Sequence, residues 1–399
     1  MSREPTFENA LSFAADLIRI PGLSGQERDV ARRVEEEFRA LGLEEVRVDD
    51  VGNVVGTARG RGEAPPALLN CHLDVVAEGD PDGWEFPPFS GAVDGGYLHG
   101  RGAMDIKGPL ALQTYAAASM IGEAPGDVVV AHTVFEERGG LGMKRLLESG
   151  AVEPGVVVIG ESTHGDVCIG HRGRAEVEVA ISGTAGHASA PERASNPLDL
   201  LGEVLSAVRD LSARQPVDPV LGSSSLVATM VDVLPQSRNV IPDSAVVTID
   251  WRILPGDDDA SLITRVEEAI RARVPAPPDG LTYEVRMATE RQRTYTGIEV
   301  ERDLLTPGFL MDPEAPVVQA AAEAVGRRET EGPATIRPWR FATDGGWSRG
   351  VFGIPTVGFA PGEERYAHTN RERLDVEEAR WAYGRYPILI SAIQRALEG

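Results

Sequence analysis

The sequence predicts an α/β fold with a largely parallel sheet in one domain and a second, ferredoxin-like domain inserted into it. Two observations predict this class. In the N-terminal part, short apolar runs alternate with helical patterns, which is typical of α/β layers built on parallel strands. From about Arg174 to Thr289 the expected order changes to β-α-β-β-α-β, the split βαβ arrangement. We therefore expect a catalytic domain from residues 1–173 and 290–399, and an inserted dimerisation or lid domain from residues 174–289.

Two amphipathic helices are expected first, at residues 6–20 and 25–41. Ser24 and Glu27 have the spacing of a capping box at the start of the second helix. Helices near 109–121 and 141–149 separate the later strands of this part. The strands are expected at short apolar runs, namely Val46–Val48, Val54–Thr57, Ala67–Leu73, Val128–Phe135 and Val156–Ile159.

The inserted stretch is expected to contain strands at 174–182, 225–233, 245–253 and 282–287, with helices at 197–214 and 261–273. Asn196 is a candidate N-cap for the first of these helices, and Pro197 occupies its first position. After the insert, a helix near 315–326 and the apolar strand Thr356–Phe359 resume the α/β pattern.

The charge balance favours an enzyme that acts on small molecules. The 399 residues contain 62 acidic and 39 basic side chains, a net charge of −23. This balance disfavours binding along nucleic acid or to anionic lipid. No apolar run approaches the roughly 20 residues of a membrane helix, and the first residues lack a signal-peptide core. We expect a cytoplasmic protein that binds neither nucleic acid nor membrane.

The first candidate site is His72-Leu73-Asp74, at the end of an expected strand. Side chains two residues apart on a strand share a face, so His72 and Asp74 point the same way. A metal-bound imidazole usually donates its other N–H to a carboxylate, and Asp74 is placed where its carboxylate could be that partner. The alternative is a polar strand end that enters a loop. Cys71 faces away and is expected to be a small buried residue, and with only Cys168 besides, the sequence has neither a disulfide scaffold nor a cysteine-rich zinc site.

The second candidate is Asp105, in the glycine-rich stretch Gly100–Gly108. A dinucleotide-binding fingerprint is disfavoured here, because the third glycine is missing and no strong strand leads into it. Asp105 could instead bridge two metals. The alternative is an aspartate in an ordinary turn.

The third candidate is the pair Glu136-Glu137, which follows the strand Val128–Phe135. Open α/β sheets place their sites at such carboxyl ends, and adjacent side chains diverge, so one can bind a metal while the other handles protons. The alternative is a solvated charge pair. Glu161 follows the next strand, and His368 follows the strand Thr356–Phe359. Together with His72 and Asp105 these residues offer the nitrogen and oxygen ligands of a two-metal hydrolytic site.

With these motifs in this order, the chain resembles the M20 metallopeptidase and deacylase family. That family includes acetylornithine deacetylases, succinyl-diaminopimelate desuccinylases, aminoacylases, and some carboxypeptidases and dipeptidases. The resemblance extends from about residue 6 to 395. It rests on His72-Leu73-Asp74, Gly100–Gly108, Glu136-Glu137, Gly160-Glu161-Ser162-Thr163, and His368 after Gly358–Gly362, and in the insert on Gly186-His187-Ala188-Ser189 and Asn239-Val240-Ile241-Pro242.

The resemblance implies a role for each of these residues. Asp105 would bridge two metals, most simply Zn²⁺, with Co²⁺ or Mn²⁺ as alternatives. One metal would also bind His72 and Glu161, and the other would bind Glu137 and His368. Asp74 would orient His72, and Glu136 would be the general base. The implied substrate and oxyanion contacts are His187, Asn239 and Arg252, with Arg172 as a further carboxylate contact. In a homodimer, His187 and Asn239 would reach the metal site of the other subunit. The alternative for Arg172 and Arg252 is a surface or hinge ion pair.

The resemblance implies hydrolysis of an amide bond next to a free carboxylate, in an N-acyl amino acid or a short peptide. A dipeptidase or carboxypeptidase of the same family is the alternative, and a non-catalytic binding protein is a third. One segment departs from the family: Phe341-Ala342-Thr343-Asp344-Gly345 stands where several members have a Gly-Thr-Ser-Asp turn. The acyl group therefore stays open. The other histidines match no ligand position and are expected either to be structural or to support the ligands from behind, namely His99, His132, His164 and His171.

Overall fold

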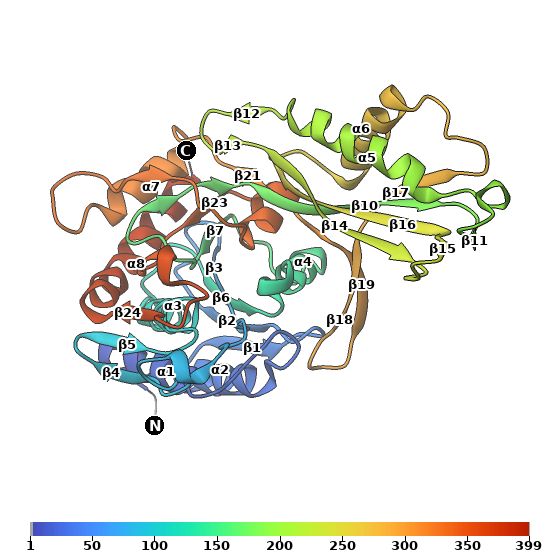
Figure 1. Ribbon diagram of the computed structural model, residues 1–399. Coiled ribbons are helices and arrows are strands. Elements are labelled where there is room, and N and C mark those ends of the chain that lie inside the picture. Colours follow the sequence, from blue (N-terminus) through green and yellow to red (C-terminus); the bar gives the residue numbers. More distant parts are fainter. Residues whose placement is uncertain (1–2, 399) are drawn as a thin grey trace. The chain divides into compact units, whose positions relative to one another are not determined.

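The computed structural model describes residues 3–398, and these form two compact units (Figure 1). The first unit consists of Met1–His171, Gln292–Val300 and Phe309–Gly399. The second consists of Arg172–Arg291 and Glu301–Gly308. Each unit has its own cluster of buried apolar side chains.

The first unit is built on an eight-stranded sheet in the order β1-β2-β6-β3-β7-β23-β8-β22. Its central strands β6, β3, β7 and β23 run parallel to one another. These central strands are fully buried and mostly apolar, as expected for parallel strands covered on both faces. The strand bounds are Glu44–Val48 (β1), Val54–Ala58 (β2), Ala67–His72 (β3), Val128–Thr133 (β6), Val156–Ile159 (β7), Val167–Cys168 (β8), Ile336–Arg337 (β22) and Thr356–Gly358 (β23).

Helix α3 packs on strands β3 and β6, and helices α1 and α8 pack on α3. Helix α2 lies against β1 and β2, and α7 packs against α8. Helix α8 was not predicted. It has Pro387 in its interior and buries one face that includes Tyr386, Leu389 and Ile390. The helix bounds are Phe7–Ile18 (α1), Arg28–Ala40 (α2), Lys107–Ser119 (α3), Leu141–Glu148 (α4), Pro316–Val325 (α7) and Val376–Ala396 (α8).

The predicted capping box at the start of α2 is wrong. The N-cap position is Glu27, which makes no capping hydrogen bond with its side chain. Ser24 lies outside the helix, and its hydroxyl donates to the carboxylate of Asp74 at 2.6 Å. The hydroxyl is therefore used for a contact between distant segments rather than for a helix end.

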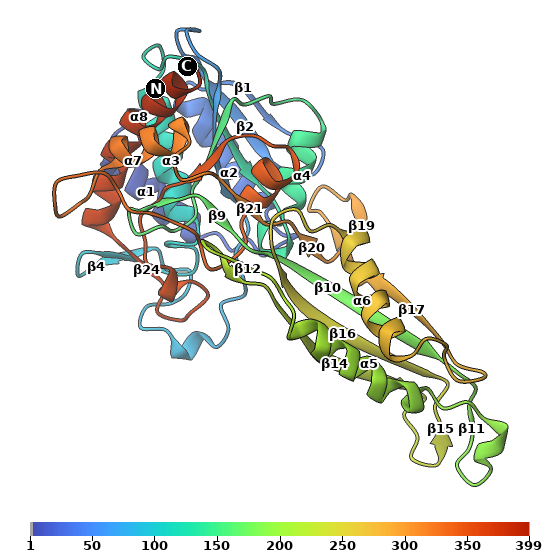
Figure 2. The same ribbon diagram turned by 90° about the horizontal axis from the view of Figure 1, so that it is seen from above.

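The second unit follows the order β10, α5, β14, β16, α6, β17, and its sheet has the antiparallel order β14-β16-β10-β17 (Figure 2). Helices α5 and α6 pack against each other and share one apolar core with the sheet. Asn196 caps α5 by accepting a hydrogen bond from the backbone of Leu198, as predicted. The bounds are Gly173–Ser182 (β10), Pro197–Ser212 (α5), Ser225–Leu234 (β14), Ser244–Ile253 (β16), Asp259–Arg273 (α6) and Thr282–Met287 (β17).

The predicted fold class, an α/β fold with a largely parallel sheet and an inserted ferredoxin-like unit, is confirmed. The second unit also takes in Glu301–Gly308, because β20 (Leu305–Thr306) pairs with β10. The functions expected for the two domains, catalysis and dimerisation or closure, stay predictions.

Short elements complete the structure. Strands β18 (Thr289–Arg293) and β19 (Glu299–Asp303) pair with each other, and so do β9 (Gly170–His171) and β21 (Phe309–Leu310). A small sheet in the first unit contains β4 (Ala92–Asp94), β5 (Tyr97–His99) and β24 (Arg373–Asp375). Strands β11 (Gly186–His187) and β15 (Val240–Ile241) pair in the second unit. Between residues 3 and 398, no helix has the length and apolar character needed to cross a membrane.

Candidate metal centre

Three neighbouring parallel strands of the first unit end at the same edge of the sheet, and each brings acidic or imidazole side chains there. His72 is the last residue of β3. Glu136 and Glu137 form a short 3₁₀ turn just after β6, and Glu161 comes two residues after β7. Strands β6 and β7 both pair with β3 in parallel, so the three carboxyl ends lie side by side.

Two loops bring the remaining residues to this edge. Asp105 ends the glycine-rich loop that precedes α3, and His368 follows the 3₁₀ turn Glu364–Tyr366. Both residues come to lie within hydrogen-bonding or ion-pairing distance of the strand-end side chains.

The first group of side chains contains His72, Asp105 and Glu161. Nε2 of His72 lies 3.3 Å from Oδ1 of Asp105 and 3.2 Å from Oε1 of Glu161. All three residues are buried, and their ligand atoms are close enough together to hold one metal ion.

The second group contains Asp105, Glu137 and His368. Nε2 of His368 lies 3.3 Å from Oδ2 of Asp105 and 3.1 Å from Oε2 of Glu137. Asp105 thus turns one oxygen to each group, which is the arrangement of a carboxylate that bridges two ions. The structure brings all five predicted ligands together; that they bind metal stays a prediction.

The hydrogen bonds of His72 favour metal binding through Nε2. Its Nδ1 lies 2.8 Å from the backbone carbonyl oxygen of Asp74, so Nδ1 carries the proton and Nε2 has its lone pair free. Nε2 is shielded from solvent and makes no well-formed hydrogen bond within residues 3–398. A buried nitrogen of this kind, facing two carboxylates, fits a metal ligand.

Asp74 contacts His72 through its backbone carbonyl and not, as predicted, through its carboxylate. Its carboxylate Oδ1 is 3.6 Å from Nδ1 of His72, and it is the backbone carbonyl of Asp74 that accepts the imidazole proton. The carboxylate instead accepts the backbone N–H of Glu136 at 3.1 Å and the hydroxyl of Ser24. It therefore holds the segment that carries the predicted general base.

The buried carboxylates of the cluster repel one another, and this repulsion favours the binding of cations. Burial, opposed by His72 and reinforced by Glu161, raises the pKa of Glu136 well above its usual range. Burial and the neighbouring Asp105 raise the pKa of Glu161 to about 7. Contacts with Asp105 and Glu137 raise the pKa of His368 to about 10. Without a cation the cluster retains protons, and a divalent ion in each group would replace them and relieve the repulsion among the carboxylates.

Sequence reasoning missed Glu372, which organises the loop of Asp105. One oxygen of its buried carboxylate accepts the backbone N–H groups of Met104 and Asp105, at 3.2 and 3.1 Å. The other accepts from Arg101 at 2.6 Å. Glu372 thus joins the segment after His368 to the loop of Asp105. No local pattern reveals this contact, because the bonded residues are 267 and 268 positions apart.

The segment Phe341–Gly345 lies in the first unit. The Thr343 hydroxyl accepts from the backbone of Gly345, and the Thr343 backbone N–H donates to Nε2 of His171. Asp344 is buried, and its carboxylate accepts from the hydroxyl of Thr133 at 2.8 Å. The Thr343 hydroxyl thus accepts a hydrogen bond within its own turn, and His171 supports the backbone of that turn.

The other predicted contacts belong to the second unit. His187 and Asn239 lie side by side: β11 pairs with β15, and the backbone N–H of Ala188 donates to the carbonyl of Asn239 at 3.1 Å. Nδ1 of the exposed His187 accepts from Ser189. Arg252 forms an ion pair with Asp250 at 3.0 Å. Arg172 donates to the carbonyl of Ser223 at 2.6 Å. Their roles towards a substrate stay predictions.

Comparison with known proteins identifies the family. The sequence profile of peptidase family M20/M25/M40 matches residues 68–385, which contain all the residues described above at the sheet edge. The chain belongs to the M20 family. It is therefore a metal-dependent hydrolase, as predicted.

Individual relatives of this M20 chain agree with the assignment. The protein YgeY of Escherichia coli is 31% identical over 366 residues, which cover 90% of this chain and 88% of YgeY. A succinyl-diaminopimelate desuccinylase of Paracoccus denitrificans is 32% identical over 323 residues, covering 77% of this chain and 81% of the relative.

A solved structure shows the same fold. The YXEP protein of Bacillus subtilis, described as a dinuclear metal-binding peptidase of the M20 family, has a TM-score of 0.71 to this chain. It is 16% identical, and the match covers 98% of this chain and 99% of YXEP.

Proposed function

We propose that this M20 hydrolase uses two metal ions to cleave the amide bond of an N-acyl amino acid or short peptide that has a free carboxylate. The single observation that carries the proposal is the position of Asp105. Its two oxygens lie 3.3 Å from Nε2 of His72 and 3.3 Å from Nε2 of His368, between two otherwise separate sets of ligands.

The donor set suits two divalent ions with nitrogen and oxygen ligands, and Zn²⁺ is the metal that we propose, with Co²⁺ or Mn²⁺ as possible replacements. One ion would be held by His72, Asp105 and Glu161, and the other by Asp105, Glu137 and His368. When bound, the ions lower the pKa of a water molecule and polarise the scissile carbonyl.

Glu136 is the proposed general base. It stands next to Glu137, with Oε2 4.0 Å from Nε2 of His72, and its backbone is held by Asp74. Because burial raises its pKa, its carboxylate is a stronger base than an exposed glutamate. Glu136 accepts the proton of the attacking water and delivers it to the leaving amine, so that the products are a carboxylate and an amine.

His187, Asn239 and Arg252 of the second unit are the proposed contacts to the developing oxyanion and the substrate, with Arg172 as a further carboxylate contact. His187 and Asn239 support one shared contact surface because their backbones are paired. Their exposure leaves them accessible to a substrate or to a second subunit.

A homodimer formed through the second unit is part of the proposal. Strand β14 lies at the edge of its sheet. It exposes Val227, Met230 and Leu234, each by more than half. An edge strand that carries exposed apolar side chains favours pairing with another chain. In such a dimer, His187 of one subunit would reach the metal centre of the other.

The substrate is tested by assaying the Zn²⁺-, Co²⁺- and Mn²⁺-supplemented enzyme against N-succinyl and N-acetyl amino acids, dipeptides and tripeptides. The name of the Paracoccus relative supports an N-acyl amino acid, and the description of YXEP supports a peptide as the alternative. Faster cleavage of the N-acyl amino acids would support the deacylase. Faster cleavage of unblocked peptides would instead identify a peptidase. If the metal-loaded protein cleaves none of these substrates, both activities are refuted.

A further inference from the structure

The first unit contains a polar cavity of about 260 Å³ whose lining residues have no role in the proposed reaction. Its wall combines aromatic and cationic side chains, including those of Trp84, Phe86, His99, Tyr366, Arg371 and Arg373. Its volume is slightly below the usual range of ligand pockets, so it suits a small molecule.

Arg373 is the unusual residue of this cavity. Its guanidinium lies over two tyrosine rings, 4.2 Å from the centroid of Tyr97 and 5.3 Å from that of Tyr366. Its Nε is shielded from solvent and has no hydrogen-bond partner in the described chain. No carboxylate between residues 3 and 398 lies within ion-pair distance of it, although the protein has 62 acidic residues.

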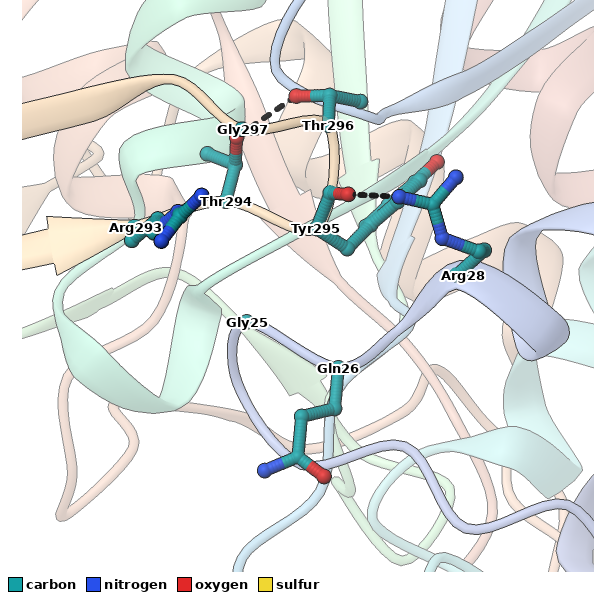
Figure 3. Close-up of a pocket in the computed structure, with 8 residues that line it drawn as sticks. All are labelled: Gly25, Gln26, Arg28, Arg293, Thr294, Tyr295, Thr296 and Gly297. Atoms are coloured by element: carbon teal, nitrogen blue, oxygen red, sulfur yellow. Dashed lines mark hydrogen bonds between the residues drawn. The ribbon is translucent and has the colours of Figure 1, made fainter.

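A second cavity-lining arginine shows the contrast (Figure 3). Arg28 lines a cavity of about 520 Å³ and also lies over a tyrosine ring, 5.4 Å from the centroid of Tyr295. Its guanidinium, however, donates to the backbone carbonyl of Tyr295. Arg28 therefore has an acceptor within the chain, whereas Arg373 has a buried donor with none.

The lining of the cavity holds two arginines, Arg371 and Arg373, and two glutamates, Glu85 and Glu372. Arg371, in the turn before β24, and Arg373, the first residue of β24, both line the cavity, and Arg371 forms no ion pair within the described chain. Glu372, between them, directs its carboxylate to Arg101 and to the loop of Asp105. Glu85, the other carboxylate of the lining, is exposed to solvent. The cavity thus presents two guanidinium groups without a counter-ion.

We propose that this cavity binds a small organic carboxylate. The planar guanidinium of Arg373 would donate to both oxygens of the carboxylate, which is the geometry that favours arginine over lysine. The aromatic side chains Trp84, Phe86 and Tyr366 would contact the apolar part of the ligand. Because Glu372 also lines the cavity, the ligand would bind beside the loop that carries Asp105, at residues to which the proposed hydrolysis gives no role.

Binding is tested on the metal-loaded enzyme by isothermal titration with benzoate, with its neutral analogue benzamide and with inorganic phosphate. We expect benzoate to bind in preference to the other two. Arg373→Met keeps an unbranched, flexible side chain and removes the guanidinium, and it should weaken benzoate binding by about tenfold or more, as expected for the loss of a charge-assisted pair. Arg28→Met is the matched control and should leave the affinity unchanged.

Two further variants keep the test decisive if Arg373→Met folds poorly. Arg371→Met changes an exposed side chain and should weaken binding to a smaller extent. Arg373→Lys keeps the charge but loses the planar fork, so its affinity should lie between those of the wild type and Arg373→Met. Benzoate that coordinates the metals would bind equally well to every arginine variant. Equal affinity of all arginine variants for benzoate would overturn the proposal. So would binding of benzamide or phosphate as tight as that of benzoate, or a loss of affinity in Arg28→Met as large as in Arg373→Met.

Discussion

The buried pair of Arg101 and Glu372 is expected to stabilise the first unit strongly. The two side chains are 3% and 0% exposed, and Nη1 of Arg101 lies 2.6 Å from Oε2 of Glu372. Glu372→Gln preserves the shape but leaves the guanidinium without a counter-charge in the interior. Breaking a buried pair on one side costs about 3–5 kcal/mol. The glutamine oxygen still accepts hydrogen bonds, so we expect a loss of about 3 kcal/mol.

Calorimetry of the metal-loaded enzyme measures this effect as a fall of the unfolding midpoint by about 4–5 °C. Asp29→Asn is the control: it breaks the exposed pair of Asp29 and Arg32, 3.3 Å apart, and should cost less than about 0.5 kcal/mol. Adding Arg101→Met to Glu372→Gln should restore part of the loss, because no buried charge then stays unpaired. If Glu372→Gln lowers the midpoint no further than Asp29→Asn does, the reasoning about the buried pair is wrong.

Three further predictions concern the metal centre. Glu136→Gln should keep the fold and the bound metals and lower kcat by about 10²–10⁴-fold, because an amide cannot accept the proton of water; a variant with more than half of the wild-type kcat would remove Glu136 from the mechanism. Chelation should lower the unfolding midpoint and Zn²⁺ should restore it, since an ion at 100 times its Kd stabilises by about 2.7 kcal/mol; a midpoint that ignores both treatments would contradict the metal assignment. Mixed subunits of the inactive variants Glu136→Gln and His187→Ala should regain activity as heterodimers, and no recovery despite demonstrated subunit exchange would exclude a contribution of His187 across the interface.

The elements that could be predicted from the sequence are those whose apolar pattern is set by burial. The strands β3, β6 and β7 are continuous buried runs, and the two helices and four strands of the insert are each found within a few residues of the expected bounds. Helix α8 was missed because Pro387 and Gly384 interrupt its pattern, and only packing of its apolar face against α3 and α7 compensates for them.

The contacts behind the metal ligands could not be predicted. Ser24 has the local spacing of a cap, but its hydroxyl bonds to Asp74, 50 residues away. Asp74 was expected to hold His72 through its carboxylate, yet its backbone carbonyl accepts the imidazole proton and its carboxylate holds Glu136. Such hydrogen bonds depend on how distant segments meet, and sequence periodicity carries no information about them.

The two groups of ligands differ in a way that follows from these supports. His72 is fixed at a strand end by the Asp74 carbonyl, and its side chain is 2% exposed. His368 lies on a loop with a positive φ of 60°, and its side chain is 52% exposed. Both imidazoles face Asp105, but only the first group is enclosed on all its ligands. If the proposed ions bind, the ion at His72 would have only buried ligands, whereas the ion at Glu137 and His368 would have one exposed ligand. We therefore expect the ion at His368 to exchange first when the metal-loaded enzyme is treated with a chelator.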